Sequence, residues 1–361
     1  MRLLHTQTLD FQEFYDNSRP PYVILSHRWD SIEVSFQDFK SANNKDGAEY
    51  EKILGCCSFA DKRGFAWVWI DTCCIDKTSS AELSEAINSM YRWYERAVEC
   101  YVYLSDVDSS DKFRKSEWFK RGWTLQELLA PDRVIFLDHS WNVIGDRQGM
   151  ARDISTVTGI PELYLRRPDR LRDASVAMKM SWASRRKTSR VEDRAYCLLG
   201  LFGVNMPLLY GEGRKAFLRL QLEILKISDD ESIFAWKGGY RHREDLGLLA
   251  IWPEEFASSG TIGRHSFSKD RPPYSMTHKG LKLHVPSNVV EGTNQIVMPL
   301  NCARGEEELP LAVVLCKHES GSWARLRCEE LITAPVERIW SRRDCSYPNK
   351  ATIYVRQLEL Y

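Results

Sequence analysis

Polar and aromatic side chains follow two apolar runs that predict neighbouring strands of a parallel sheet. The first run, residues 22–26, leads into Ser26, His27, Arg28 and Trp29, and the second run, residues 66–70, leads into Asp71. Ligands of open parallel sheets bind in the crevice at the carboxyl ends of the strands. A hydroxyl, two basic groups, an indole and a carboxylate at this edge therefore predict a binding site for a small ligand.

Glu127 is the most informative carboxylate in the chain. It lies one helical turn after Trp123 and has Leu125, Leu128 and Leu129 as neighbours. A carboxyl group among apolar side chains is expected to have a raised pKa, because burial penalises its charged form. Glu127 is therefore a candidate catalytic group, and the alternative is a structural glutamate paired with Arg121 or another cation.

Other chemistries have weaker support in the sequence. Cys73 or Cys74 with His27 would resemble a Cys-His hydrolase, but thiols in apolar surroundings are usually inert. The chain has neither a Gly-x-Gly-x-x-Gly nor a P-loop motif, which disfavours a dinucleotide-fold dehydrogenase and a P-loop NTPase. It also has no Cys-x-x-Cys pair, and its eight His are dispersed, so we expect no metal site.

Four short apolar runs alternate with helical patterns in the first 140 residues, which predicts an α/β fold with a mostly parallel sheet. The predicted strands are residues 22–26, 66–71, 100–104 and 133–137. Helices are predicted within residues 35–63, after a capping box at Ser79-x-x-Glu82, and over residues 123–129. An open sheet covered by helices on both faces should therefore position the candidate site.

The rest of the chain changes character twice. Residues 141–231 predict a helical extension, with helices over residues 176–184, 191–202 and 213–227. Residues 232–361 alternate short strands with turns and predict a β-rich region. We therefore expect three regions, 1–140, 141–231 and 232–361. Within the second region, the basic run Arg185-Arg186-Lys187 predicts a solvated helix end or a partner for carboxylates.

Composition narrows the class of protein. Fifty Lys and Arg balance fifty Asp and Glu, so no overall charge draws the chain to nucleic acid or to an anionic membrane. No apolar run is long enough to span a membrane, and residues 1–10 lack the apolar core of a secretion signal. Ten cysteines in apolar segments are typical of buried thiols in a reducing compartment. We therefore expect an intracellular, cytoplasmic protein.

Several of these motifs occur in the order found in one protein family. The chain resembles the fungal HET (heterokaryon incompatibility) domain over roughly residues 1 to 236, by the signature motifs of that family. The matching segments are Met1-Arg2-Leu3-Leu4, Pro20 to Trp29, Trp69 to Asp76, Ser84 to Tyr91, Arg121 to Pro131, Arg190 to Gly200 and Met206 to Gly213.

This resemblance implies both a fold and an activity. HET proteins trigger programmed cell death when unlike fungal cells fuse, and the family is regarded as a distant relative of the TIR (Toll/interleukin-1 receptor) domain. A TIR/flavodoxin-like open parallel sheet is therefore implied. In TIR domains that cleave NAD, a glutamate in a Trp-Cys-x-x-Glu-Leu-like segment is catalytic. Trp123-Thr124-Leu125-Gln126-Glu127-Leu128 looks like its counterpart, with Thr124 in the place of the cysteine.

The implied reaction needs only one carboxylate. Cleavage of the nicotinamide–ribose bond passes through an oxocarbenium-like state, and nicotinamide leaves as a neutral molecule without an acid catalyst. Glu127 would stabilise the positive charge, Trp29 or Trp123 would stack on a ring, and His27 or Arg28 would hold phosphates. NAD is then a substrate, and no cofactor or metal is needed.

Two alternatives stay open. The domain could be a non-catalytic TIR-like adaptor that signals death through self-assembly or through recruitment of other death-signalling proteins. It could also be a sensor that binds NAD or a related nucleotide without cleaving it. Exposure of Glu127 in a cleft with Ser26, Arg28 and Asp71 would favour the enzyme, and a sealed ion pair would favour the adaptor.

Overall fold

The chain folds into two compact units. The computed structural model describes residues 1–15, 18–30, 32–41, 45, 47–238, 247–267, 272–286, 294–307, 309–318, 321–326, 328–333 and 350–357. The first unit comprises residues 1–171, 186–189 and 196–208, and the second comprises residues 172–185, 190–195 and 209–361. The boundaries expected after residues 140 and 231, and a separate role for each of the three regions, stay predictions.

A seven-stranded sheet forms the centre of the first unit, in the order β2-β1-β4-β3-β5-β6-β7. Its strands are β1 (Arg2–His5), β2 (Phe11–Glu13), β3 (Val23–His27), β4 (Trp67–Trp69), β5 (Glu99–Tyr103), β6 (Val134–Leu137) and β7 (Val143–Asp146). The four strands β4, β3, β5 and β6 are parallel neighbours. These are the four strands that the sequence predicts, whereas the antiparallel strands β1, β2 and β7 were not expected.

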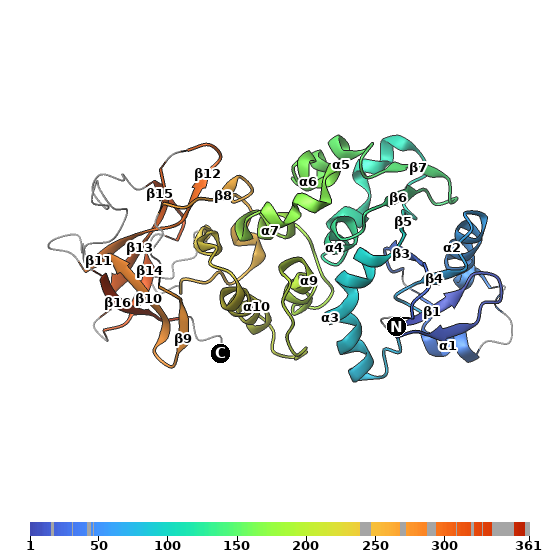
Figure 1. The fold of residues 1–361 in the computed structure, drawn as a ribbon, viewed down its shortest axis with the longest axis horizontal. Helices are drawn as coiled ribbons and strands as arrows, with labels where there is room; N and C mark the ends of the chain where they lie inside the picture. Colours follow the sequence, from blue (N-terminus) through green and yellow to red (C-terminus); the bar gives the residue numbers. More distant parts are fainter. Residues whose placement is uncertain are drawn as a thin grey trace. The chain divides into compact units, whose positions relative to one another are not determined.

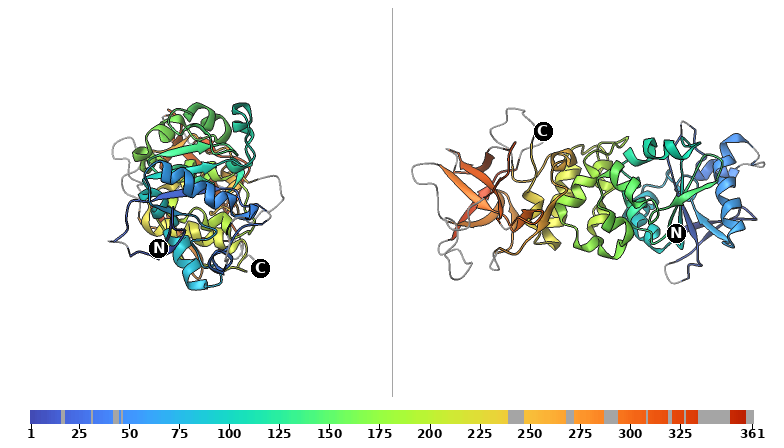
Figure 2. Two further views of the ribbon diagram at one scale, coloured as in Figure 1. Left: turned by 90° about the vertical axis from the view of Figure 1, so that its right-hand side faces the viewer. Right: turned by 90° about the horizontal axis from the view of Figure 1, so that it is seen from above.

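Helices cover both faces of this sheet. The helices of the first unit are α1 (Phe36–Ser41), α2 (Glu51–Lys62), α3 (Ser80–Arg96), α4 (Thr124–Leu129), α5 (Ala151–Thr158), α6 (Glu162–Arg166) and α9 (Leu199–Phe202), with 3-10 helices η1 (Ala48–Tyr50), η2 (Ser110–Lys115) and η3 (Glu117–Lys120). Figures 1 and 2 show α1 and α2 on one face and α3 and α4 on the other. Right-handed crossovers require this arrangement, because the chain turns back across β3 between β4 and β5.

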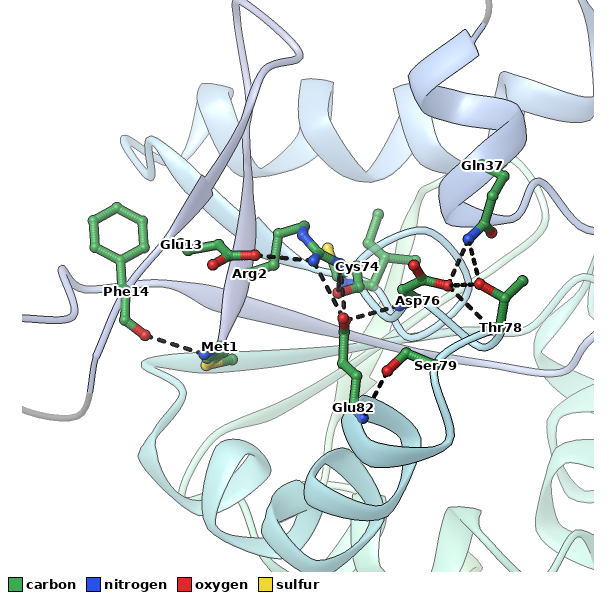
Figure 3. A network of polar contacts seen from close by, with 11 residues as sticks. Met1, Arg2, Glu13, Phe14, Gln37, Cys74, Asp76, Thr78, Ser79 and Glu82 are labelled. Atoms are coloured by element: carbon green, nitrogen blue, oxygen red, sulfur yellow. Dashed lines mark hydrogen bonds and ion pairs between the residues drawn. The ribbon is translucent and has the colours of Figure 1, made fainter.

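The start of α3 is held by a polar network that includes half of the predicted capping box (Figure 3). The Ser79 hydroxyl accepts a hydrogen bond from the Glu82 backbone N–H at 3.3 Å, as a capping residue should. The Glu82 carboxylate accepts instead from the Asp76 backbone N–H and from Arg2 on β1, both at 2.8 Å. Arg2 also donates to the Cys74 carbonyl at 3.3 Å. The network therefore fixes the loop that follows β4.

Two of the other predicted helical segments are interrupted. The helix-prone segment 35–63 forms α1, η1 and α2, and the pattern over residues 191–202 forms α8 (Asp193–Tyr196) and α9. The segments predicted at 176–184 and 213–227 correspond closely to α7 (Val176–Ala183) and α10 (Lys215–Ile227). The 3-10 helix η4 (Pro168–Asp173) precedes α7.

The second unit contains most of the strands of the expected β-rich region. Its larger sheet has the order β11-β13-β14-β16-β10-β9, with β15 paired to β13, and β8 pairs with β12 in a smaller sheet. The elements are η5 (Glu231–Phe234), η6 (Pro253–Phe256), β8 (Ile262–Arg264), β9 (Ser275–Thr277), β10 (Gly280–Pro286), β11 (Gln295–Pro299), β12 (Cys302–Arg304), β13 (Leu311–Lys317), β14 (Trp323–Leu326), β15 (Ile332–Thr333) and β16 (Lys350–Val355).

The cysteines of the described residues behave as buried thiols. None of these nine cysteines forms a disulfide, and eight of them are buried. Cys73 and Cys100 are completely buried, and burial raises the pKa of each thiol well above its ordinary value. The helices that the structure describes include none that is long and apolar enough to cross a membrane.

Candidate functional site

The candidate site lies where the direction of the chain through the parallel sheet reverses. From β3 the chain moves to β4 on one side and then returns to β5 on the other side of β3. In open α/β sheets, ligands bind outside the carboxyl ends of the strands at such a switch point. Ser26 and His27 are the last two residues of β3, so they stand directly at this point.

Glu127 reaches the end of β3 from the short helix α4. All six residues of α4 are buried, and only 7% of the Glu127 surface is exposed. The Ser26 hydroxyl donates a short hydrogen bond to Oε2 of Glu127. Among the residues that the structure describes, none forms an ion pair with Glu127, so the expected alternative of a pair with Arg121 is not observed.

Burial dominates the ionisation of Glu127. Desolvation raises the pKa of its carboxyl to about 8, and the negative charge of Asp71 adds to this effect. The hydrogen bond from Ser26 and the positive charge of Arg121 oppose it. Glu127 therefore keeps its proton near neutral pH and loses it under mildly alkaline conditions, as the apolar neighbours in the sequence predict.

Arg186 supports the start of α4 from a distant part of the chain. Its buried guanidinium donates hydrogen bonds to the Arg121 carbonyl and to the Thr124 hydroxyl, both at 2.9 Å. Arg186 is buried, so the prediction of a solvated helix end is wrong for this residue, and the acceptors of these two hydrogen bonds lie inside the first unit. Burial lowers the pKa of Arg186 to about 10.

His27 belongs to a second group of polar side chains beside Ser26. Its imidazole is buried, and Nε2 lies 3.7 Å from a Glu33 oxygen and 3.8 Å from an Asp71 oxygen. Lys52 donates to the same Glu33 carboxylate at 2.5 Å. Burial raises the pKa of Glu33, but its interactions with His27 and Lys52 outweigh burial and lower that pKa to about 2. The sequence predicts that His27 binds a phosphate, but its imidazole is buried and is not exposed to a ligand.

Trp29 and Asp71 form the exposed edge of the site. The Trp29 indole N–H donates to Asp71 at 2.8 Å, and 42% of the Trp29 surface is exposed. The Lys77 ammonium lies 3.8 Å from the centre of the Trp29 ring. This pair of an exposed indole and a cation fits an aromatic ligand that carries negative charge.

Arg28 and Trp123, the two remaining residues that the sequence predicts for the site, have no hydrogen bond or ion pair with His27, Trp29 or Asp71 in the part of the chain that the structure describes. Arg28 is partly exposed and lies 3.8 Å from the Asp30 carboxylate, where it can reach an anion at the same edge. Trp123 is half-buried and directly precedes α4. Ser26 and Glu127 thus form one contacting pair, and His27, Trp29 and Asp71 form a neighbouring group.

Several residues of the site gave no signal in the sequence. Trp118 binds Ser26 through its indole N–H at 2.8 Å, and Lys77, Glu33 and Lys52 complete the second group. Only the position of Lys77, just after the Asp71 loop, could have suggested a role. The Cys-His alternative is weakened, because Cys73 is completely buried and its pKa is raised. No cluster of three potential metal ligands occurs among the described residues.

The pKa values of Glu127 and Glu33 are shifted in opposite directions, so the two carboxyl groups should have opposite effects on the pH dependence of stability. The pKa of Glu127 is raised, so its contribution is full below about pH 4.5 and is lost as the pH rises through about 8. The pKa of Glu33 is lowered, so its contribution is present above about pH 4.5 and is lost as the pH falls through about 2. Glu127→Gln should therefore remove a loss of roughly a few kcal/mol that develops between about pH 4.5 and 8.

Urea unfolding at a series of pH values, followed by tryptophan fluorescence, measures this effect. Glu85 is an exposed glutamate on α3, so Glu85→Gln serves as the matched control and should keep the wild-type pH profile. An unchanged slope between about pH 4.5 and 8 in Glu127→Gln would contradict the assigned ionisation of Glu127.

Comparisons with known proteins agree on the family of the first part of the chain. Residues 22–114 match the family model described as heterokaryon incompatibility protein (HET). The chain is also similar to the vegetative incompatibility protein HET-E-1 of Podospora anserina, with 49% identity over 222 residues. This alignment covers 57% of the chain but only 16% of that relative. No solved structure is significantly similar. The HET resemblance is therefore confirmed, and Glu127 lies just beyond the matched range.

Proposed function

We propose that this protein, which carries a heterokaryon incompatibility domain, is a cell-death effector that cleaves NAD at the nicotinamide–ribose bond. Glu127 is the proposed catalytic group. The proposal depends above all on one observation, the buried Glu127 carboxylate that meets the carboxyl end of β3 without an ion pair among the described residues. Such a group is available to stabilise a positive charge that develops in the reaction.

The order of the parallel strands supports this proposal. Numbered along the chain, the strands β3, β4, β5 and β6 lie in the order 2-1-3-4, as in doubly wound flavodoxin-like sheets. The TIR-like relationship that we propose implies the same type of sheet. In this arrangement Ser26, Asp71 and Glu127 come from separate segments to one edge.

The chemistry of the edge fits a dinucleotide. In our proposal, the exposed ring of Trp29 stacks on a base, and Lys77 and Arg28 neutralise phosphates. The ribose then lies toward Glu127, whose ionised carboxylate stabilises the oxocarbenium-like state. Glu127 is only 7% exposed, so we propose that assembly of several copies, or another partner, moves the residues that cover it.

Incubation of concentrated protein with NAD tests the proposed reaction. Nicotinamide release is followed by chromatography over a range of protein concentrations. Release that rises more steeply than protein concentration would support assembly-dependent cleavage. A folded and assembled protein that releases no nicotinamide would contradict the proposed enzyme.

Removal of the Trp29 ring is expected to weaken substrate binding more than the chemical step. Stacking of a base on an aromatic side chain contributes about 1–3 kcal/mol, so Trp29→Ala should raise the KM for NAD about tenfold or more. Steady-state kinetics of nicotinamide release measure this change. Tyr15→Ala removes another exposed aromatic ring of the first unit and should leave KM unchanged. An unaltered KM in Trp29→Ala would exclude this ring from the substrate site.

The burial of Glu127 also favours a second candidate function. A carboxylate that is nearly sealed and bonded to Ser26 could simply stabilise an adaptor domain that acts through self-assembly or through death-signalling partners. In that case Glu127→Gln would still trigger cell death in a fungal expression assay. Loss of killing together with loss of nicotinamide release would favour the enzyme.

A further inference from the structure

A single hydroxyl connects Glu127 to the sheet. Ser26 is completely buried at the end of β3, between the indole of Trp118 and the carboxylate of Glu127. The Trp118 nitrogen lies 2.8 Å from the Ser26 oxygen. Trp118 belongs to η3 and Glu127 to α4, so Ser26 is the point where three segments meet.

The chemistry of these groups fixes the direction of both hydrogen bonds when Glu127 is ionised. An indole N–H can only donate, so the Ser26 oxygen must accept from Trp118. A hydroxyl has one proton, and the other neighbour of Ser26 in this contact is an oxygen of Glu127. An ionised carboxylate can only accept, so the Ser26 proton then points to Glu127, and this bond stabilises the charged form more than the neutral acid.

We propose that Ser26 is a positioning residue that fixes one oxygen of Glu127 and favours its ionised form, and that Trp118 sets the direction of the Ser26 hydroxyl. Ser26 was expected from the sequence to bind the ligand directly. The Ser26 oxygen accepts from Trp118 and its proton binds Glu127, so in our proposal Ser26 acts through Glu127 and not on the ligand. A catalytic effect of Ser26 rests on the proposed function. The two hydrogen bonds are features of the structure and are independent of it.

The other charged and titratable groups around Glu127 leave this role to Ser26. The groups that influence Glu127 come from β3, β5, α3, the loop after β4 and the segments around α4. They are Ser26, Cys100, Tyr94, Asp71, Arg121 and Arg186. Burial raises the pKa values of Tyr94 and Cys100 well above their ordinary values, so both groups stay neutral. Of the interactions that lower the pKa of Glu127, the bond from Ser26 is the largest.

The direct test measures the ionisation of Glu127 in the 361-residue chain. Infrared difference spectra, recorded against Glu127→Gln as a blank, follow the carbonyl band of the protonated carboxyl group as the pH is raised. Loss of one hydrogen bond to the charged form should raise the pKa of Glu127 by about one unit or more in Ser26→Ala. Ser26→Thr keeps the hydroxyl and should stay close to wild type.

Two further variants separate positioning from simple loss of packing. Trp118→Phe keeps an aromatic ring but frees the Ser26 oxygen, so we expect a smaller rise of the Glu127 pKa than in Ser26→Ala. Ser89→Ala removes another buried hydroxyl of the first unit, on α3, and should leave that pKa unchanged. If NAD cleavage is observed, its pH profile should shift upward in Ser26→Ala by the same amount as the infrared titration.

Each outcome of this test bears on the proposal separately from the enzyme activity. A raised pKa in Ser26→Ala with rescue by Ser26→Thr supports the positioning role, even if the protein releases no nicotinamide. An unchanged or lowered pKa of Glu127 in folded Ser26→Ala would overturn the role. An absence of nicotinamide release alone would overturn only the proposed function.

Discussion

Replacement of Glu127 by glutamine is expected to lower the rate of nicotinamide release at least about 100-fold. Loss of one preorganised group that stabilises charge in a transition state typically costs two to three orders of magnitude. Glutamine keeps the size of the side chain and can still bind the Ser26 hydroxyl, but it cannot become negative. The effect should therefore appear in kcat, with little change in KM.

The rate of the wild-type protein should also depend on pH. The proposed reaction needs the ionised carboxylate, and the pKa of Glu127 is raised to about 8 by burial. Nicotinamide release should thus increase as the pH rises through about 8 and then level off. Glu85→Gln is the matched control and should keep the wild-type rate. Release by Glu127→Gln at the wild-type rate would refute the catalytic assignment.

Replacement of Arg147 by alanine is expected to reduce the stability of the protein by about 3 kcal/mol or more, because three carbonyls lose their donors. Arg147 is 1% exposed and lies where α4 ends. Its guanidinium donates to the carbonyls of Leu128, Pro131 and Asp132 at distances of 2.8, 2.7 and 2.9 Å. Its removal would leave these carbonyls without donors inside the protein, and each such group costs about 1–3 kcal/mol.

Urea unfolding monitored by circular dichroism measures the effect of Arg147→Ala. Arg147→Lys keeps the charge but loses the planar fork of donors, so it should recover only part of the stability. Arg152→Ala removes an exposed arginine from α5 and should change stability by less than about 0.5 kcal/mol. An unchanged urea midpoint for Arg147→Ala would show that the three carbonyls find other donors.

Local patterns predicted the parts of the fold that local forces stabilise. The run before Ser26 is apolar because β3 is buried on both faces, and the pattern after Ser79 is amphipathic because α3 has one face in the core. Strands β1 and β2 escaped prediction because they are short and one of them lies at the edge of the sheet. Strand β1 pairs with β4, which lies far along the chain, and β2 pairs only with β1.

The candidate site was predictable only where its residues come from strand ends or from a short motif. Ser26, Asp71 and Glu127 met those conditions. The contact between Trp118 and Ser26 joins residues 92 positions apart, and no pattern in either segment indicates it. Arg186 looked like part of a solvated basic run, yet it binds Thr124 at a separation of 62 residues. Such pairings arise from tertiary packing, which single-sequence patterns do not encode.

The buried thiol of Cys100 can report how often α4 moves away from the sheet. A substrate would need this movement to reach Glu127. Its sulfur lies 3.8 Å from the backbone carbonyl of Glu127, beneath α4. A thiol-modifying reagent can attack Cys100 only in molecules in which α4 has moved away from the sheet. The labelling rate of this cysteine therefore gives the frequency of that opening, and a partner that activates the protein should accelerate the labelling.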